Sequence, residues 1–74
     1  MKKKYDFAIV SGGFDPVHVG HLRMFLDAKK IANKVILLLN NDEWLIKKKG
    51  KPFMNQNQRK EILEEFISIS EVII

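Results

Sequence analysis

Residues 5–21 read YDFAIVSGGFDPVHVGH, a stretch that passes from apolar residues to two glycines and then to two histidines. Residues 5–11 are mostly apolar and β-prone, which predicts a strand. The Gly12-Gly13 pair breaks that strand. Over residues 19–32 the apolar positions Leu22, Phe25, Leu26 and Ile31 recur at the spacing of one helix face, so a helix is expected to follow. A strand, a glycine loop and a helix in succession are typical of an α/β domain.

The next part of the chain repeats the alternation of strand and helix. A continuous apolar run at residues 35–39 is typical of a strand that helices bury on both faces, usually in a parallel sheet. Asn41 or Asp42 is the predicted N-cap of a short helix. Gly50 and Pro52 are expected to end that helix.

A third helix and a third strand are expected in the last part of the chain. Asn55 followed by Gln58 resembles the capping box of a helix start. The apolar stripe of this helix comprises Ile62, Leu63, Phe66 and Ile67. Residues 72–74 begin a strand. The order β-α-β-α-α-β predicts an α/β fold with a Rossmann-like parallel sheet and right-handed crossovers, truncated to three strands.

Length and composition limit the chain to one small domain. Its 74 residues are 46% hydrophobic and 30% charged, which is ordinary for a soluble globular chain. The absence of cysteine excludes a disulfide framework and a thiolate metal site. No apolar run approaches the length of a membrane helix, and glycines interrupt the apolar stretch behind the basic residues 1–4 too early for a signal peptide. We therefore expect a cytoplasmic chain without a membrane partner.

The net charge of +4 comes from 13 Lys and Arg residues against 9 Asp and Glu residues. Four lysines are crowded into residues 47–51, which predicts an anionic partner such as a nucleotide, a phosphorylated metabolite or nucleic acid. A solvated helix end is the structural alternative. Nucleic acid ranks last, because surfaces that bind it interleave basic with aromatic residues and only Trp44 and Phe53 lie near these lysines. No nucleic-acid partner is expected.

The loop between the first strand and the first helix carries the strongest chemical signal. Ligands bind at the carboxyl ends of strands in open parallel sheets, and a helix N-terminus favours anions. Gly12 and Gly13 lack side chains, so the backbone can approach a ligand closely. His18 and His21 are three residues apart and share one face of a helical turn, and Gly20 between them leaves room for a bulky ligand. This arrangement predicts stabilisation of a phosphate near its transition state.

Two other interpretations of the histidines remain open. Each ring could serve only in packing or in capping the helix. A metal site is also conceivable, because His is a common ligand, but Asp15 is the only candidate for a third ligand. The Gly-Gly loop and the strand-to-helix turn favour the phosphate interpretation, and no metal bound by the protein alone is expected.

Residues 13–21, GFDPVHVGH, resemble the (T/G)-x-F-D-x-x-H-x-G-H signature of the cytidylyltransferase-like nucleotidyltransferases. Residues 40–43, NNDE, resemble the N/S-x-D-E turn of that family after its second strand. Gly50-Lys51-Pro52 and Arg59 resemble a G-R-P segment that an arginine follows in the adenylyltransferase branch. The resemblance covers nearly the whole chain and implies a Rossmann-like nucleotidyltransferase domain.

The resemblance assigns roles to the glycine and histidine loop. His18 and His21 would stabilise the transition state at the α-phosphate of a nucleoside triphosphate. The nucleotide-binding residues of the same loop would be Gly12, Gly13, Phe14, Asp15 and Gly20. The amides of the first three would line the phosphate loop.

It also assigns roles on the acceptor side. Lys48 or its neighbours, together with Arg59, would hold the phosphates of the acceptor or of the leaving pyrophosphate. Asp42 would lie at the mouth of the acceptor site. The structural alternatives are a solvated helix residue for Arg59 and a plain N-cap for Asp42. Packing against the core, rather than ligand contact, is expected for Trp44, Phe53 and Met54.

The implied activity is transfer of CMP or AMP from CTP or ATP to a phosphorylated small molecule, with release of pyrophosphate. Mg²⁺ would bridge the phosphates of the nucleotide, and a homodimer is expected. The C-terminal motif of the family has no match in this sequence, so residues 1–74 are expected to form a single domain that lacks its C-terminal portion. The choice between CTP and ATP stays open. The alternative is a non-catalytic nucleotide- or phosphate-binding fragment that folds as part of an oligomer.

Overall fold

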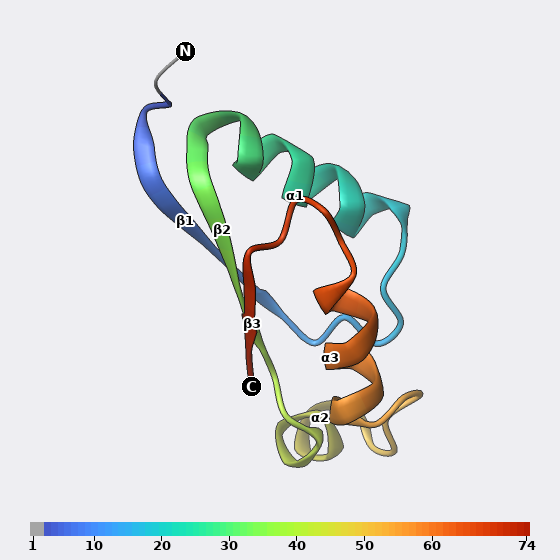
Figure 1. The fold of residues 1–74 in the computed structure, drawn as a ribbon. Coiled ribbons are helices and arrows are strands. Elements are labelled where there is room, and N and C mark those ends of the chain that lie inside the picture. Colours follow the sequence, from blue (N-terminus) through green and yellow to red (C-terminus); the bar gives the residue numbers. More distant parts are fainter. Residues whose placement is uncertain (1–2) are drawn as a thin grey trace.

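The secondary structure follows the predicted alternation of strands and helices. The computed structural model describes residues 3–74. Its elements are β1 (Tyr5–Gly12), α1 (Val19–Ile31), β2 (Ala32–Leu39), α2 (Asp42–Lys49), α3 (Gln56–Glu64) and β3 (Glu71–Ile73) (Figure 1). The order β-α-β-α-α-β is therefore confirmed.

The strands form one parallel sheet in the order β1-β2-β3, with β2 in the centre. Val10 is the Cα partner of Leu37, and Leu38 is the Cα partner of Ile73. Since all strands run the same way, the carboxyl ends of β1 and β2 meet at one rim, from which the chain continues to α1 and α2 (Figure 1). The predicted Rossmann-like architecture is confirmed.

Within residues 3–74, the core lies on one face of the sheet. Phe25 of α1 and Leu63 of α3 pack on the same strand face, which β2 contributes through alternate residues. The residues of β2 on that face are Val35, Leu37 and Leu39. On the opposite face, Phe7 and Ile9 of β1 are each 57% exposed. The expectation that residues 35–39 are buried on both faces is therefore wrong for this chain, because both packed helices lie on the same side.

Two helix predictions also need correction. Phe25 of α1 is buried, but its predicted companions Leu22, Leu26 and Ile31 are exposed. The helix α3 ends at Glu64, and the N–H groups of Glu65 and Phe66 bond three residues back, in the tighter geometry of a 3₁₀ turn.

The apolar residues that follow α3 differ in burial. Phe66 still packs on the core, with its ring centroid 5.6 Å from that of Phe25, whereas Ile67 is fully exposed. The strand β2 begins at Ala32, directly after α1 and earlier than predicted. None of the helices within residues 3–74 has the length and apolarity needed to cross a membrane.

Candidate functional site

The predicted site residues gather at the rim where β1 and β2 end. The N–H of Asn40 donates to the carbonyl of Gly12 at 2.9 Å, which continues the pairing of the two strands to the start of their loops. Residues 13–18 lead from this rim into α1, and Asn41 leads into α2. The histidine loop and the start of α2 therefore occupy neighbouring places.

His18 and His21 cap the start of α1 reciprocally. The Nδ1 atom of His18 accepts a hydrogen bond from the N–H of Gly20 at 3.1 Å. In return, the N–H of His18 donates to Nδ1 of His21 at 3.0 Å. The ring centroids are 3.9 Å apart and the ring planes are inclined by 30°. The capping alternative is thus correct as geometry, and it also fixes where both rings lie.

This capping decides which ring nitrogens carry protons. A nitrogen that accepts a hydrogen bond has no proton, so the neutral form of each imidazole is protonated at Nε2. Within residues 3–74, neither Nε2 atom of His18 or His21 bonds to the protein. Two N–H donors therefore stand together at the positive end of a helix, where an anion is favoured.

His21 is the more buried member of the pair. Burial, and after it the positive charge on His18, lowers the pKa of His21 below its ordinary value of 6.5. At neutral pH the ring of His21 is therefore an uncharged donor through Nε2. Such a donor stays oriented by its cap and needs no proton exchange before it contacts a phosphate oxygen.

The glycines of the loop make room for protein side chains. A Cβ atom at Gly12 would lie 3.2 Å from the ring of Phe14, and one at Gly13 would lie 2.9 Å from Leu45. A Cβ atom at Gly20 would lie 2.8 Å from the ring of His18. The expectation that Gly20 leaves room for a ligand is corrected in this respect, because the His18 imidazole occupies that space.

Phe14 packs against the histidine pair on the side of the hydrophobic core. Its φ of 49° lies in the left-handed region, which costs a residue with a side chain roughly 1–3 kcal/mol. The side chain is buried, and its ring meets those of His21 and Phe25 at centroid distances of 4.9 and 5.5 Å. Phe14 thus connects the histidine loop with the hydrophobic core.

Asp15 is turned toward the segment before α3. Its Oδ2 and Oδ1 atoms accept hydrogen bonds from the N–H groups of Phe53 and Met54, each at 2.7 Å. The Lys49 ammonium lies 2.8 Å from Oδ2 and also donates to the main-chain carbonyl of Asp15. The side chain of Asp15 is only 1% exposed.

These contacts determine the charge of Asp15. Burial by itself raises the pKa of Asp15, but the bonds from Lys49 and from the two amides outweigh it and hold the pKa below 3.8. Asp15 therefore stays ionised and bound to protein groups at neutral pH. Within the part of the chain that the structure describes, no three His, Asp or Glu side chains converge on a metal position. The alternative of a metal held by Asp15 and the histidines finds no support in this geometry.

Arg59 lies at the centre of the rim and is only 1% exposed. Its Nε atom donates to the carbonyl of Met54 at 3.0 Å, and Nη1 donates to those of Gly13 and Asn40 at 2.8 and 2.7 Å. Its Nη2 atom donates to Oδ1 of Asp42 at 2.7 Å. The alternative of a solvated helix residue is wrong, because all three nitrogen atoms of the guanidinium donate to protein oxygens.

Asp42 is the first residue of α2 rather than its cap. The cap is Asn41, whose Oδ1 accepts from the N–H of Trp44 at 2.8 Å. The N–H of Asp42 donates to Oε1 of Gln56 at 2.9 Å, while its carboxylate pairs with Arg59. The N-cap alternative for Asp42 is therefore wrong, and Asp42 joins α2 to α3.

The lysine-rich end of α2 divides into two roles. Lys49 is tied to Asp15, whereas Lys48 is exposed and lies 5.7 Å from the centre of the Trp44 ring. Gly50, with a φ of 92°, ends the helix as predicted.

Trp44 and Phe53 are exposed, so the expectation that they pack in the core is wrong. Only Leu45 of α2 is buried, so this helix leaves little core for aromatic side chains.

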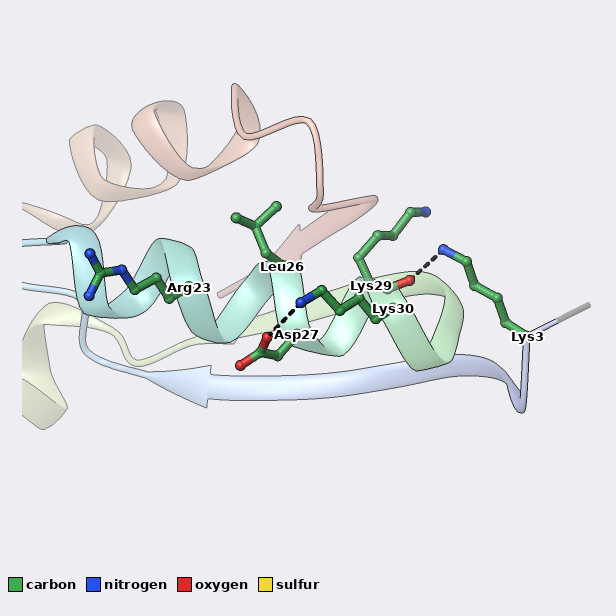
Figure 2. A pocket seen from close by; sticks show the side chains of 6 residues that line it. All are labelled: Lys3, Arg23, Leu26, Asp27, Lys29 and Lys30. Atoms are coloured by element: carbon green, nitrogen blue, oxygen red, sulfur yellow. Dashed lines mark hydrogen bonds and ion pairs between the residues drawn. The ribbon is translucent and has the colours of Figure 1, made fainter. Parts of the chain in front are cut away.

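A separate hollow of about 590 Å³ runs along α1 (Figure 2). Its lining residues are Lys3, Arg23, Leu26, Asp27, Lys29 and Lys30. Lys3 donates to the carbonyl of Lys29, and Lys30 pairs with Asp27 at 3.5 Å. None of the predicted site residues lines this hollow, so it is distinct from the rim.

Comparisons with known proteins agree with the fold and with the family resemblance. Residues 9–74 match the family described as cytidylyltransferase-like. An FAD synthase of Thermococcus sibiricus is 32% identical over 76 residues, which cover 100% of this chain and 51% of that protein. The glycerol-3-phosphate cytidylyltransferase of Bacillus subtilis is 33% identical over 73 residues, which cover 99% of this chain and 54% of that protein. The chain thus spans about half the length of the curated relatives it matches.

A solved structure shares the fold. The lipopolysaccharide core biosynthesis protein of Thermoplasma volcanium superposes with a TM-score of 0.84 at 21% sequence identity. The match covers 90% of this chain and 55% of that one. At this level of identity the similarity establishes the architecture.

Proposed function

The chain belongs to the cytidylyltransferase-like family, and on that premise we propose that it transfers a nucleotidyl group from CTP or ATP to a phosphorylated small molecule. The observation that carries the proposal is the histidine pair. Both Nδ1 atoms of His18 and His21 are bound within the capping box, so both Nε2–H groups are available to one anion. A phosphate group fits two such donors at a helix N-terminus.

The proposed reaction would use this placement. A phosphate oxygen of the acceptor forms a bond to the α-phosphorus of the nucleotide, and the bond from that phosphorus to the β-bridging oxygen breaks. Pyrophosphate leaves with the bonding electron pair. In the five-coordinate transition state, negative charge grows on the equatorial oxygens, where the Nε2–H groups of His18 and His21 would donate. In-line attack needs no covalent intermediate on the protein.

The exposed lysines supply charge for the phosphates. Lys48, with Lys47 and Lys51 beside it, would neutralise the acceptor phosphate or the leaving pyrophosphate as a mobile point charge. Mg²⁺ would enter with the nucleoside triphosphate and would neutralise part of the charge of its phosphates. The homodimer implied by the resemblance stays a prediction, which analytical ultracentrifugation checks.

The relatives leave the donor and the acceptor open. One is named for FAD synthesis and the other for cytidylyl transfer to glycerol 3-phosphate, so the names describe two different products. Both names are compatible with a nucleotide donor and a phosphorylated acceptor, which is the level at which the proposal is made.

The test uses a variant that keeps the cap and removes the donors. In His18→Ser/His21→Met, the Ser hydroxyl still accepts at the N-cap, and the Met side chain occupies the place of the His21 ring. Neither side chain carries an N–H group in place of the imidazole Nε2–H. Calorimetric titration with CTP and with ATP, each with Mg²⁺, is expected to show one nucleotide binding to the wild-type chain, and the variant is expected to lose this binding while its thermal unfolding is unchanged.

Turnover is the second readout. Removing one such donor is expected to lower kcat by about 10²–10³. Equal nucleotide affinity and turnover in wild type and variant would show that the histidines do not hold the phosphate. Failure of the wild-type chain to bind either nucleotide would contradict the proposal for these 74 residues and would favour a non-catalytic fragment that functions within an oligomer.

A further inference from the structure

The short segment Gly13 to Asp15 is anchored at both of its ends. The carbonyl of Gly13 accepts from Nη1 of Arg59, and two residues later the Asp15 carboxylate accepts from the amides of Phe53 and Met54. Both anchors come from residues 49–59, a segment distant in sequence. The loop that carries the histidines is therefore fixed to the segment that carries the lysines.

Phe14 lies between these two anchors and transmits their effect. Its left-handed backbone conformation is unfavourable for a residue with a side chain, and such conformations persist only where the surroundings over-determine them. The ring of Phe14 meets the edge of His21 at a centroid distance of 4.9 Å. A rotation of the Gly13 carbonyl would move this ring and, with it, the support of His21.

Arg59 connects several loops through hydrogen bonds. Its guanidinium bonds to three main-chain carbonyls and to the Asp42 carboxylate, so four of its N–H groups are satisfied by protein atoms. These contacts of the buried Arg59 side chain join the ends of β1 and β2 to the starts of α2 and α3. A planar fork is suited to fixing several oxygens at once.

We propose that Arg59 and Asp15 are positioning residues for the His18–His21 pair rather than phosphate ligands, and that they fix the histidine loop to the lysine-rich end of α2 as one rigid unit. Lys49 serves the same unit through Asp15, while the neighbouring Lys48 remains available to a ligand. The catalytic consequence rests on the proposed function, but the geometric part is measurable without any nucleotide.

The decisive measurement is the protonation state of the histidine ring nitrogens. A ¹H–¹⁵N long-range NMR correlation spectrum of the full chain reports it. In the wild type, Nδ1 of His21 is expected to be unprotonated and Nε2 protonated. In Arg59→Lys, which keeps the charge but loses the fork, the ring of His21 is expected to populate both tautomers, and its pKa is expected to rise toward 6.5. The control Lys60→Met, which removes the next cation on α3, is expected to leave both rings unchanged.

The outcomes are distinct. A folded Arg59→Lys variant with wild-type histidine signals would overturn the proposal. If that variant does not fold, Lys49→Met decides, because Lys49 is partly exposed and its loss weakens only the Asp15 anchor. A shift of the His21 signals in the same direction, but smaller, supports the proposal, and unchanged signals overturn it.

Kinetics separate positioning from ligand contact. A misplaced histidine pair is expected to lower kcat about tenfold to a hundredfold in Arg59→Lys with little change in KM. Loss of a phosphate ligand would instead raise KM for the nucleotide or the acceptor, and that result would overturn the assignment. If the wild type shows no turnover, the proposed function fails while the NMR arm still decides the positioning role.

Discussion

The rim at the carboxyl ends of β1 and β2 differs from the sheet face opposite α1 and α3. The charged side chains at the rim are bonded within the chain, whereas apolar side chains on that face are exposed to solvent. At the rim, two buried charged side chains, Arg59 and Asp15, meet oxygen or nitrogen partners at 2.7–3.0 Å. On the uncovered face, Phe7 and Ile9 remain largely exposed. Hydrogen bonds within the chain thus set the geometry of the site, whereas apolar side chains are buried only on the sheet face that α1 and α3 cover.

Neighbouring residues of β2 test this contrast most strongly. Leu37 is 0% exposed beneath the helices, and Leu38 points to the other face with 40% exposure. Leu37→Ala is expected to lower the free energy of unfolding by about 2–5 kcal/mol, whereas Leu38→Ala is expected to cost about 0.5 kcal/mol. Urea denaturation measures both. Equal losses would mean that the second face is covered in solution, and the contrast between the regions would disappear.

Asp15 tests the rim. In Asp15→Asn the charge-assisted bonds from Lys49 and the amides are weakened, and the free energy of unfolding is expected to fall by about 1.5–3 kcal/mol. Asp27→Asn is the matched control, because Asp27 forms only an exposed pair with Lys30.

The pH dependence of this contribution has a defined sign. The pKa of Asp15 is lower in the folded chain than 3.8, so its stabilisation is fully present above pH 3.8 and is lost as the pH falls through the lowered pKa. Acid titration of stability is therefore expected to be less steep for Asp15→Asn than for wild type. The same acid sensitivity in both proteins would show that the carboxylate is not the group that titrates.

The cap of α2 is expected to have a smaller effect. Asn41→Ala removes the side-chain acceptor for the N–H of Trp44 and is expected to cost about 1 kcal/mol. Asn57→Ala, at an exposed position within α3, is the control and is expected to be neutral or slightly stabilising. Thermal unfolding distinguishes them. A neutral Asn41→Ala would mean that the contacts of Asp42 with Arg59 and Gln56 hold the start of α2 without the cap.

The smallest expected effect concerns His21. Its pKa lies below 6.5 mainly through burial and secondly through the charge of His18. His18→Asn keeps the cap and removes that charge, so the pKa of His21 is expected to rise but to stay below 6.5. Because folding disfavours the protonated ring, stability is expected to decrease as the pH falls through 6.5. NMR titration checks both, and an unchanged pKa would remove the charge of His18 as a cause.

The order of elements and the histidine pair were predictable because both depend on local signals. The apolar run of β2, the N-cap position before α2 and the Gly50 stop are written in short stretches of sequence. The spacing of His18 and His21 places them on one helical turn wherever that helix begins. Their mutual capping follows from the same spacing.

The central place of Arg59 was not predictable from its neighbours in sequence. Its partners, including Gly13 and Asn40, lie 46 and 19 residues away, and burial of a charged residue depends on such distant partners. The predicted third helix was too long for a similar reason, because Phe66 packs on the core although it lies beyond the end of α3. Exposure of Trp44 and Phe53 depends on how much of the sheet the helices cover.

The junction between α1 and β2 has no loop, because Ile31 ends the helix and Ala32 begins the strand. One inserted residue there would turn the inward side chains of β2 to the uncovered face, since strand residues alternate sides. The loop after β1 is constrained in another way, because the anchors at Gly13 and Asp15 fix its length. Over evolution, changes in chain length are therefore expected to be rare at both places and to accumulate at residues 50–52 after α2, where they alter neither the register of the sheet nor the histidine loop.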